Sequence, residues 1–423
     1  MNQGLILAAP SSGSGKTTIM LGLLRAFRRR GTDIRGAKSG PDYIDPRFHE
    51  AACGQVCMNL DAWAMSPDRI LSLASGTGHL LIEGAMGLFD GAPPEGTGAT
   101  ADLARILSLP VVLVVDAARM AQSVAPLVAG FANHDPRVHL AGVILNNVGS
   151  LRHETMLRQA LKITGIEVVG AIHRQDGLAH PSRHLGLVQA GERADLDSFL
   201  ETVADSVNVS VDLARILAIA APIPSKQSTT GFAPPAQRIA IASDRAFAFA
   251  YPHLLADWQK AGAELSFFSP LNNEAPAPAD MIILPGGYPE LHAGKLSVST
   301  VFKDAMKLAA EKALIYGECG GYMALGETLT DAKGTTHPML GLLPLCTSFA
   351  TRKLHLGYRN LTPKAGPFSG ALKAHEFHYA TTIKANGPDL FEATDAEGNS
   401  LSAMGLIRGN VSGSFAHIID RSN

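Results

Sequence analysis

The chain is poor in the residue types that mark special classes of protein. Cysteine occurs 4 times and tryptophan 2 times among 423 residues, and the aromatic fraction is 6%. Thiols this few and this scattered exclude a disulfide framework. No apolar run reaches membrane-spanning length, and a formal net charge of −2 offers no electrostatic attraction to nucleic acid or to an anionic membrane.

The remaining composition is that of an ordinary globular protein. Hydrophobic residues make up 46% of the chain and charged residues 17%. A chain of this length can build cores for about two or three domains. The first residues, MNQGLILAAP, pass into a strand pattern without a basic signal region, so we expect a cytoplasmic protein.

His49, Cys53 and Cys57 recur at helical spacing, which is compatible with a metal site. Cysteine is among the residue types most often found buried, and two buried thiols explain the same spacing without a metal. We therefore favour buried thiols over a metal site in this segment.

A phosphate-binding loop is the strongest local signal. Residues 10–18, PSSGSGKTT, follow an apolar strand and lead into a helix, so backbone N–H groups can cradle phosphate oxygens. Lys16 can reach the terminal phosphates and Thr17 can hold Mg²⁺. Pro10 replaces the usual first glycine of this motif, and Ser11 stands where partition-type ATPases carry a second lysine. We predict that a nucleoside triphosphate with Mg²⁺ binds through Gly13, Ser14, Gly15, Lys16, Thr17 and Thr18.

A proline-rich segment, residues 221–237 (APIPSKQSTTGFAPPAQ), divides the chain as a linker. Residues 1–220 and 238–423 therefore form separate predicted domains. In the first, fully apolar strands alternate with helices, which indicates a parallel sheet covered on both faces. Its predicted strands are Leu5–Ala9, Leu80–Ile82, Val111–Val115 and Leu140–Leu145, and its predicted helices are Thr17–Arg29, Ala101–Leu107 and Glu154–Ile163. The second is also α/β, with strands at Arg238–Ala242, Leu265–Ser269, Met281–Leu284 and Ala313–Tyr316.

Acidic side chains of the first domain gather where parallel-sheet chemistry occurs. Glu83 ends the apolar strand that precedes EGAMGLFDG, so it should emerge beside the phosphate loop as a Mg²⁺ ligand. Residues 38–46, KSGPDYIDP, are rich in turn formers and charges, and we expect a surface loop there. Together with Asp90, the acids Asp42 and Asp45 predict a site for metal, phosphate and substrate, although each alone fits a solvated loop equally well.

Asn146 and Asn147 close another predicted strand of this domain. The amide of Asn146 could read a purine edge, and a turn-forming Asn pair explains the same residues equally well. Asp116, which ends the strand Val111–Val115, is a structural or supporting acid.

The second domain contains a nucleophile elbow built around Cys319. A strand delivers this thiol into the tight turn GECGG, after which a helix begins. We expect the helix start to favour the thiolate and neighbouring amides to stabilise an oxyanion. His417 is the favoured base, with His375 and His378 as competitors.

Glycines supply the remaining parts of this predicted site. The segment LPGGYPE, residues 284–290, is a second strand-end loop whose exposed amides could complete an oxyanion hole. We assign Gly286, Gly287 and Gly320 to the oxyanion-binding part of this site.

Six motifs in order make the chain resemble one family. PSSGSGKTT, KSGPDYIDPRFH, EGAMGLFDG, LPGGYPE, YGECGGYM and HEFHYA are similar to those of the a,c-diamide synthases of corrinoid biosynthesis, and they extend over nearly the whole chain. The resemblance implies a dethiobiotin-synthetase-like ATP domain followed by a class I glutamine amidotransferase domain. It implies ATP- and glutamine-dependent amidation of the a and c acetates of hydrogenobyrinic or cobyrinic acid through acyl phosphates.

The resemblance also implies roles for individual residues. Cys319 becomes the nucleophile and His417 its activating base. Thr17 and Glu83 are the expected Mg²⁺ ligands, with Asp45 or Asp42 as a further ligand. The corrinoid would be held by Asp42, Tyr43, Asp45 and Asp90, with Lys38, Arg47, His49 and Arg352 as candidate cations for its carboxylates. The wider amidotransferase class places a Glu two residues after the histidine, but this chain has Ile419 there. No third triad member follows from the sequence, and Asp420 is a speculative substitute.

Two alternatives fit the same motifs. A diamide synthase for nickel sirohydrochlorin shares them, and a partition-type ATPase switch with an inactive second domain shares the phosphate loop. Ser11 and the intact elbow at Cys319 argue against the switch. We expect no nucleic acid or membrane partner, and a homodimer is one open arrangement.

Overall fold

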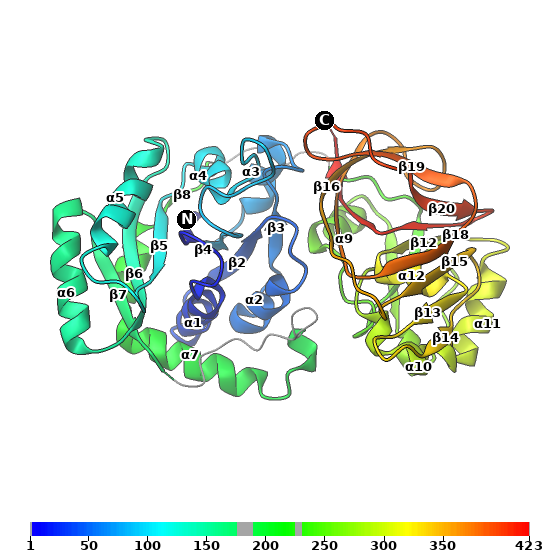
Figure 1. The fold of residues 1–423 in the computed structure, drawn as a ribbon, viewed down its shortest axis with the longest axis horizontal. Coiled ribbons are helices and arrows are strands. Elements are labelled where there is room, and N and C mark those ends of the chain that lie inside the picture. Colours follow the sequence, from blue (N-terminus) through cyan, green and yellow to red (C-terminus); the bar gives the residue numbers. More distant parts are fainter. Residues whose placement is uncertain (1, 176–188, 225–230, 423) are drawn as a thin grey trace. The chain divides into compact units, whose positions relative to one another are not determined.

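The computed structural model describes residues 2–175, 189–224 and 231–422, which divide into two compact units, Met1–Thr229 and Thr230–Asn423 (Figure 1). Part of the predicted linker, residues 225–230, lies outside the described residues. Its first residues form β8 (Ala221–Pro222), which pairs antiparallel with β1 of the first unit. Over the described residues, no helix combines the length and apolar character needed to cross a bilayer.

The first unit is built on a parallel sheet with strand order β3-β2-β4-β1-β5-β6-β7. Its central strands are buried on both faces, which matches their unbroken apolar sequences. The strands are β1 (Gln3–Ala8), β2 (Ile34–Ser39), β3 (Met58–Leu60), β4 (His79–Glu83), β5 (Val111–Asp116), β6 (Leu140–Val148) and β7 (Val168–His173).

Helices connect these strands and cover the sheet in Figure 1. They are α1 (Lys16–Arg29), α2 (Asp45–Cys53), α3 (Pro67–Ala74), α4 (Thr100–Leu107), α5 (Val124–His134), α6 (Leu151–Leu161), α7 (Leu196–Ser210) and α8 (Leu213–Ile219), with 3₁₀ turns η1 (Lys162–Thr164) and η2 (Ala190–Glu192). Register places Glu83 level with Leu7 of β1 and with Lys38 of β2. The carboxyl ends of β1, β2 and β4 therefore lie together at one edge of the sheet.

The second unit contains a mixed sheet of order β10-β9-β11-β12-β21-β20-β19-β16-β17-β22. Its first half is parallel, and the predicted strands Arg238–Ala242 and Met281–Leu284 appear with those bounds as β9 and β11. The other parallel strands are β10 (Glu264–Phe268), β12 (Leu314–Glu318) and β21 (Val411–Ser414). The antiparallel half consists of β16 (His355–Pro363), β17 (Leu372–His378), β19 (Asp389–Thr394), β20 (Met404–Arg408) and β22 (Ala416–Arg421).

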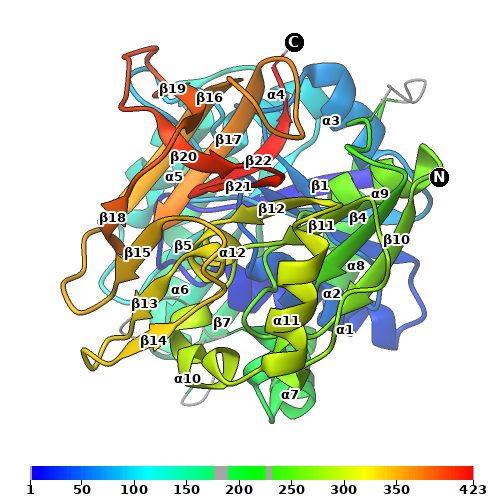
Figure 2. The ribbon, with the colours of Figure 1, turned by 90° about the vertical axis from the view of Figure 1, so that its right-hand side faces the viewer.

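The mixed sheet curls so that its last strand returns to its middle. β22 pairs with β17, yet the backbone N–H of Ile418 in β22 donates to the Glu318 side chain at the end of β12. Figure 2 shows the strands of this unit, among them β12, β21 and β22. The curl carries residues near the C-terminus back to the end of β12, where Cys319 follows.

The remaining elements of the second unit pack around this sheet. A four-stranded sheet contains β14 (Thr336–Pro338), β13 (Thr328–Thr330), β15 (Leu345–Ser348) and β18 (Thr381–Ala385). The helices are α9 (Pro252–Lys260), α10 (Ala293–Ser297), α11 (Thr300–Ala309) and α12 (Gly320–Leu325), with 3₁₀ turns η3 (Pro270–Asn272) and η4 (Pro289–Leu291). Two α/β units confirm the predicted fold class, but the antiparallel strands β16, β17, β19, β20 and β22 were not among the sequence predictions.

Candidate active sites

The phosphate loop has the backbone geometry that its glycines predict. Gly13 and Gly15 adopt φ values of 81° and 87°, in the left-handed region that favours glycine. Gly15 is the N-cap of α1, and no side chain caps the helix. The first N–H groups of α1 therefore face the loop, which is the arrangement that binds phosphate at helix N-termini.

Lys16 and Asn146 hold this loop in place. Lys16 Nζ donates to the carbonyl of Met86, 2.6 Å away, in the loop that follows β4. The Asn146 amide donates to the carbonyl of Ser14 at 3.0 Å, and a Cβ on Gly15 would lie only 2.2 Å from Asn146 Nδ2. Asn146 thus braces the phosphate loop, which gives its amide a different partner from the predicted purine edge.

Five side chains form a charged cluster behind the loop. Lys38 Nζ donates to Asp45 Oδ2 at 2.6 Å and to Glu83 Oε1 at 2.8 Å. Thr17 Oγ1 donates to the same Glu83 oxygen at 2.6 Å. His49 Nε2 lies 2.6 Å from Glu83 Oε2, and its Nδ1 lies 3.4 Å from the thiol of Cys57. The three groups predicted to hold Mg²⁺ are therefore brought together.

Charge compensation explains how these groups are buried. Burial alone would raise the pKa of Glu83, but Lys38 and the hydrogen bond from His49 hold that pKa well below its ordinary value. Burial alone would lower the pKa of Lys38, but Asp45 and Glu83 raise it well above its ordinary value. Glu83 is 0% exposed, so the pair is kept charged inside the protein.

The prediction of a surface loop over residues 38–46 is wrong. Lys38 is 4% exposed, and Tyr43 and Asp45 are also buried. The reason is that Lys38 ends a buried strand and finds both carboxylates there. Lys38 and His49 were also considered as cations for a corrinoid, and this is wrong too, because both are buried and bonded to Glu83.

Asp42 starts the turn into α2. Its Oδ1 accepts the backbone N–H groups of Ile44 and Asp45 at 2.8 and 3.1 Å. Burial, followed by the charge of Asp45, raises the pKa of Asp42 to about 7. Its other oxygen lies 3.9 Å from Lys38 Nζ, so Asp42 borders the charged cluster.

The donor set of the cluster fits a magnesium ion. One hydroxyl and two carboxylates are hard oxygen ligands of the kind that Mg²⁺ prefers. Thr17, Asp45 and Glu83 would supply them beside the phosphate loop, and Lys38 compensates the carboxylate charges between them.

Asp90 is exposed in the loop that follows β4, where its charge acts on Lys16. Its Oδ2 accepts the backbone N–H of Gly87 at 2.9 Å, which orders the turn after Met86.

Asn147 has a φ of 55° and donates to Asp116 at 3.1 Å, so this Asn is a turn former and Asp116 supports it.

Cys319 occupies a strained elbow. It follows β12 directly, precedes α12, and has a φ of 46°, which is unusual for a non-glycine residue. Small neighbours make the turn possible, since a Cβ on Gly321 would lie 1.8 Å from the carbonyl oxygen of Leu284. The thiol lies 3.8 Å from the carbonyl oxygen of Phe377.

The predicted glycines and His417 meet at one place. A Cβ on Gly286 would lie 2.1 Å from Cε1 of His417, and one on Gly320 would lie 2.9 Å from the backbone N of Gly287. His417 itself is 0% exposed, so its ring is enclosed by protein where it would meet such a Cβ. The amide of Gly287 is thus adjacent to the residue that follows Cys319.

Burial keeps both predicted catalytic groups neutral. It raises the pKa of the Cys319 thiol, with a further contribution from Glu290, and it lowers the pKa of His417 to about 3. The resting form of Cys319 is therefore the thiol rather than the expected thiolate. A neutral imidazole is the form that can accept the thiol proton.

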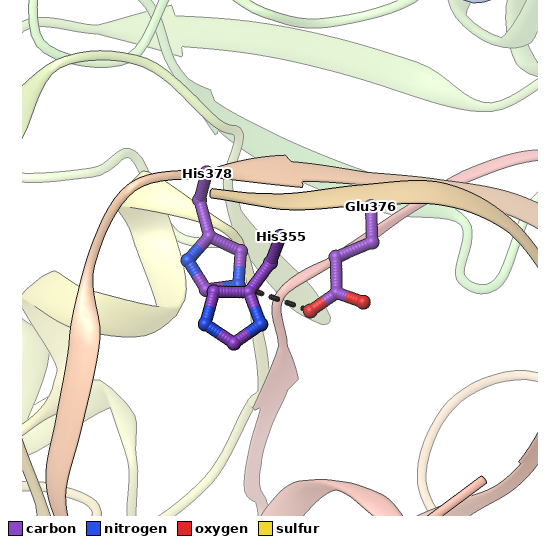
Figure 3. A group of neighbouring side chains, drawn as sticks. All are labelled: His355, Glu376 and His378. Atoms are coloured by element: carbon purple, nitrogen blue, oxygen red, sulfur yellow. Dashed lines mark hydrogen bonds and ion pairs between the residues drawn. The ribbon is translucent and has the colours of Figure 1, made fainter. Parts of the chain in front are cut away.

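His355, Glu376 and His378 form a second cluster near this site, shown in Figure 3. His378 Nε2 lies 3.0 Å from Glu376 Oε1, and Arg359 Nη2 lies 2.7 Å from Glu376 Oε2. The two imidazoles stack with an interplanar angle of 6°, so their in-plane lone pairs do not converge on one point. Arg359 already compensates the carboxylate, and the cluster fits a hydrogen-bonded wall better than a metal site.

The two competing histidines have other partners. His378 also stacks on Phe415, with the two ring centroids 3.9 Å apart. His375 is paired with His417 across the neighbouring strands β17 and β22. Burial lowers the pKa of His375 to about 4.

Comparison with known proteins agrees with both units. Residues 5–188 match the CobQ/CobB/MinD/ParA nucleotide binding domain, and residues 238–423 match the CobB/CobQ-like glutamine amidotransferase domain. Hydrogenobyrinate a,c-diamide synthase of Brucella anthropi is 54% identical over 99% of this chain and 98% of its own length. The chain belongs to the a,c-diamide synthase family.

Further relatives carry the same name. That of Rhizobium meliloti is 54% identical over 99% of each chain, and that of Mesorhizobium japonicum is 50% identical over 100% of this chain and 99% of its own. Membership makes the chain a carbon–nitrogen ligase with a glutamine amidotransferase domain.

Sequence reasoning missed two side chains at these sites. Lys38 was placed on the surface, although its position at the end of a strand next to that of Glu83 could have indicated a buried partner. Glu318, directly before Cys319, was quoted in the elbow motif but given no role. Its Oε2 lies 3.8 Å from His417 Nδ1.

Proposed function

We propose that the chain uses ATP and glutamine to convert the a and c acetate carboxylates of hydrogenobyrinic acid into amides. The observation that carries this proposal is identity of 54% over nearly the full length with hydrogenobyrinate a,c-diamide synthases. The charged cluster around Glu83 supports it because such a site suits phosphate chemistry. The buried, neutral pair Cys319 and His417 supports it because such a site suits thiol chemistry.

The second unit releases ammonia from glutamine. His417 takes the proton from the Cys319 thiol, and the thiolate attacks the side-chain amide carbon of glutamine. The amides of Gly287 and Gly320 stabilise the resulting oxyanion. His417 then gives its proton to the leaving ammonia, and water hydrolyses the thioester to glutamate.

The first unit activates the acceptor carboxylate. A carboxylate cannot lose hydroxide readily, so its oxygen attacks the terminal phosphorus of ATP and forms an acyl phosphate with release of ADP. Lys16 and the N–H groups at the start of α1 hold the phosphates. Ammonia then displaces phosphate from the acyl carbon and yields the amide.

Thr17, Asp45 and Glu83 would hold Mg²⁺ in this unit, and the bound ion would supply positive charge against the phosphates. Lys38 keeps Glu83 ionised and fixes the positions of the Glu83 and Asp45 carboxylates. His49 holds the remaining oxygen of Glu83, so the acid cannot rotate away.

The acceptor side of the first unit contains Asp42, Tyr43 and Asp90. Asp90 is exposed on an ordered turn, which suits contact with a large substrate. Asp45 is buried against Lys38, so we now group it with the metal ligands rather than the corrinoid contacts.

Mass spectrometry of the products tests this function. The protein is incubated with ATP, Mg²⁺ and glutamine and, separately, with hydrogenobyrinic acid, cobyrinic acid or nickel sirohydrochlorin. We expect two successive acid-to-amide changes on hydrogenobyrinic acid. A diamide formed only from nickel sirohydrochlorin would replace the proposed substrate, and no amide from any macrocycle together with ATP hydrolysis would favour the ATPase switch.

A further inference from the structure

A buried carboxyl group stands against the histidine of the glutamine site. Glu318 Oε1 accepts the backbone N–H of Ile418 at 3.1 Å, and its Oε2 lies 3.8 Å from Nδ1 of His417. The side chain of Glu318 is 13% exposed and that of His417 is 0% exposed. The backbone contact to the residue after His417 fixes the carboxyl beside the imidazole ring.

The surroundings of Glu318 make a carboxyl costly there. It borders a cavity of about 30 Å³ that is otherwise lined mainly by aromatic and aliphatic side chains, among them Leu254, Trp258 and Ile283. Burial raises the pKa of Glu318 to about 8. An apolar residue would fill this position at lower free-energy cost, so the carboxyl needs a reason other than stability.

The positions where a third triad member was sought are engaged elsewhere. Ile419 is 0% exposed, and its carbonyl oxygen lies 2.8 Å from Nε2 of His253. The Asp420 carboxylate accepts the backbone N–H of Arg421 at 2.8 Å.

We propose that Glu318 is the positioning residue of the glutamine site, holding Nδ1 of His417 so that the other ring nitrogen serves the Cys319 thiol. The inference rests on the proposed glutaminase roles of Cys319 and His417. It assigns to the residue before the nucleophile a task that the wider class gives to a residue after the histidine.

The fold explains why the residue before Cys319 can supply the carboxyl that orients His417. β12 delivers Glu318 and Cys319 in succession, and the curl of the mixed sheet brings β22 with His417 back to the end of β12. One strand end therefore supplies both the nucleophile and the group that orients its base.

The chemistry needs no additional reactant. When the imidazole accepts the Cys319 proton it becomes a cation, and a neighbouring cation favours the ionised form of a carboxyl. Glu318 then pairs with the imidazolium until His417 passes the proton to ammonia. Glu318 does not touch glutamine in this account.

Steady-state glutamate formation from glutamine tests the proposal. The variants are Glu318→Gln, Glu318→Asp and Asp420→Asn, with Glu264→Gln, an exposed glutamate on β10, as the matched control. We expect Glu318→Gln to lower kcat about 10- to 100-fold, with KM for glutamine unchanged. This is less than the roughly 10⁴-fold loss in serine triads, because a thiol is the better nucleophile. Glu318→Asp should recover part of kcat, and ammonium-driven diamide formation should persist in both.

The outcomes separate this inference from the proposed function. Cys319→Ala is assayed in parallel, and glutamate formation by that variant would overturn the glutaminase assignment itself. If Cys319→Ala is inactive while Glu318→Gln keeps the parental kcat, or if Asp420→Asn alone causes the loss, Glu318 has no positioning role. If Glu318→Gln fails to fold, Glu318→Asp decides. A folded Asp variant that forms no more glutamate than Cys319→Ala would also overturn the proposal.

Discussion

The two sites solve the problem of buried ionisable groups in opposite ways. In the first unit Lys38 and Glu83 are buried together and stay charged, because Lys38 lies within hydrogen-bonding distance of the carboxylates of Glu83 and Asp45. In the second unit Cys319 and His417 are also buried, and burial shifts both pKa values toward the neutral form.

The difference matches the chemistry proposed for each unit. A site for ATP and a divalent cation must present fixed charges before its ligands arrive, and paired ions do this without reorganisation. A thiol site must keep its nucleophile unreactive toward water and oxidants until glutamine is bound, and a buried neutral thiol does this. The comparison teaches that burial alone does not decide ionisation; the partners do.

Removing the phosphate-binding charge should have the largest effect. Lys16→Ala should lower diamide formation by about 10²- to 10³-fold with glutamine or with ammonium, because the lysine stabilises charge that develops during phosphoryl transfer. Product formation with each nitrogen donor measures this. Glutamate formation by the same variant should persist, and unimpaired diamide formation would contradict the assignment of the loop.

Crowding the ring of His417 should lower only the activity of the Cys319 site in the second unit. In Gly286→Ala the new methyl would lie 2.1 Å from Cε1 of His417, so the ring must shift. Misplacing a catalytic group by about 1 Å costs about 10²-fold in rate. Glutamate formation should fall while ammonium-driven amidation is kept. Gly294→Ala is the control, since the added Cβ would lie 3.7 Å from a His337 ring atom, an ordinary contact. Equal loss in both variants would mean that the steric argument is wrong.

Neutralising one carboxylate at a time distinguishes the roles of Asp45 and Asp90 in the first unit. Asp45→Asn should raise the Mg²⁺ concentration needed for amidation with either nitrogen donor and lower the rate about 10- to 100-fold. Asp90→Asn, on the exposed loop, should instead raise the share of monoamide released. Titration of Mg²⁺ and the ratio of monoamide to diamide distinguish the two. Monoamide accumulation in Asp45→Asn without altered Mg²⁺ dependence would return Asp45 to the corrinoid contacts.

The smallest effect concerns stability and pH at Glu318. The pKa of this group is raised from 4.5 to about 8, so the folded state holds a proton that the unfolded state loses, and the contribution of Glu318 to stability falls as pH rises between these values. The slope is at most about 1.4 kcal/mol per pH unit. Glu318→Gln should lack it, so its Tm relative to the parent protein should be higher at pH 8 than at pH 5. Parallel Tm curves would contradict the raised pKa.

Local patterns made much of the fold predictable. β9 and β11 were predicted with the bounds observed, and the strand, loop and helix around Lys16 and Cys319 appear as expected, because each depends on residues adjacent in sequence. The fold class followed from apolar strands alternating with helices.

What could not be predicted depends on distant partners. Lys38 is buried because Glu83, 45 residues away, ends the neighbouring strand. Glu318 meets His417 because β22 returns to β12, and the antiparallel strands that cause this return have no distinctive sequence signal. Asn146 supports Ser14 across 132 residues, which no local pattern reveals.

The central claim is that the two chemistries are separable, and the nitrogen-donor dependence of Cys319→Ala tests it most directly. Mass spectrometry of the products is carried out with glutamine and, separately, with a high concentration of ammonium, using the same ATP and corrinoid. The account predicts no diamide with glutamine and near-parental diamide with ammonium, because free ammonia bypasses the thiol. Failure with both donors in a folded variant that still binds ATP, or full activity with glutamine, would contradict it.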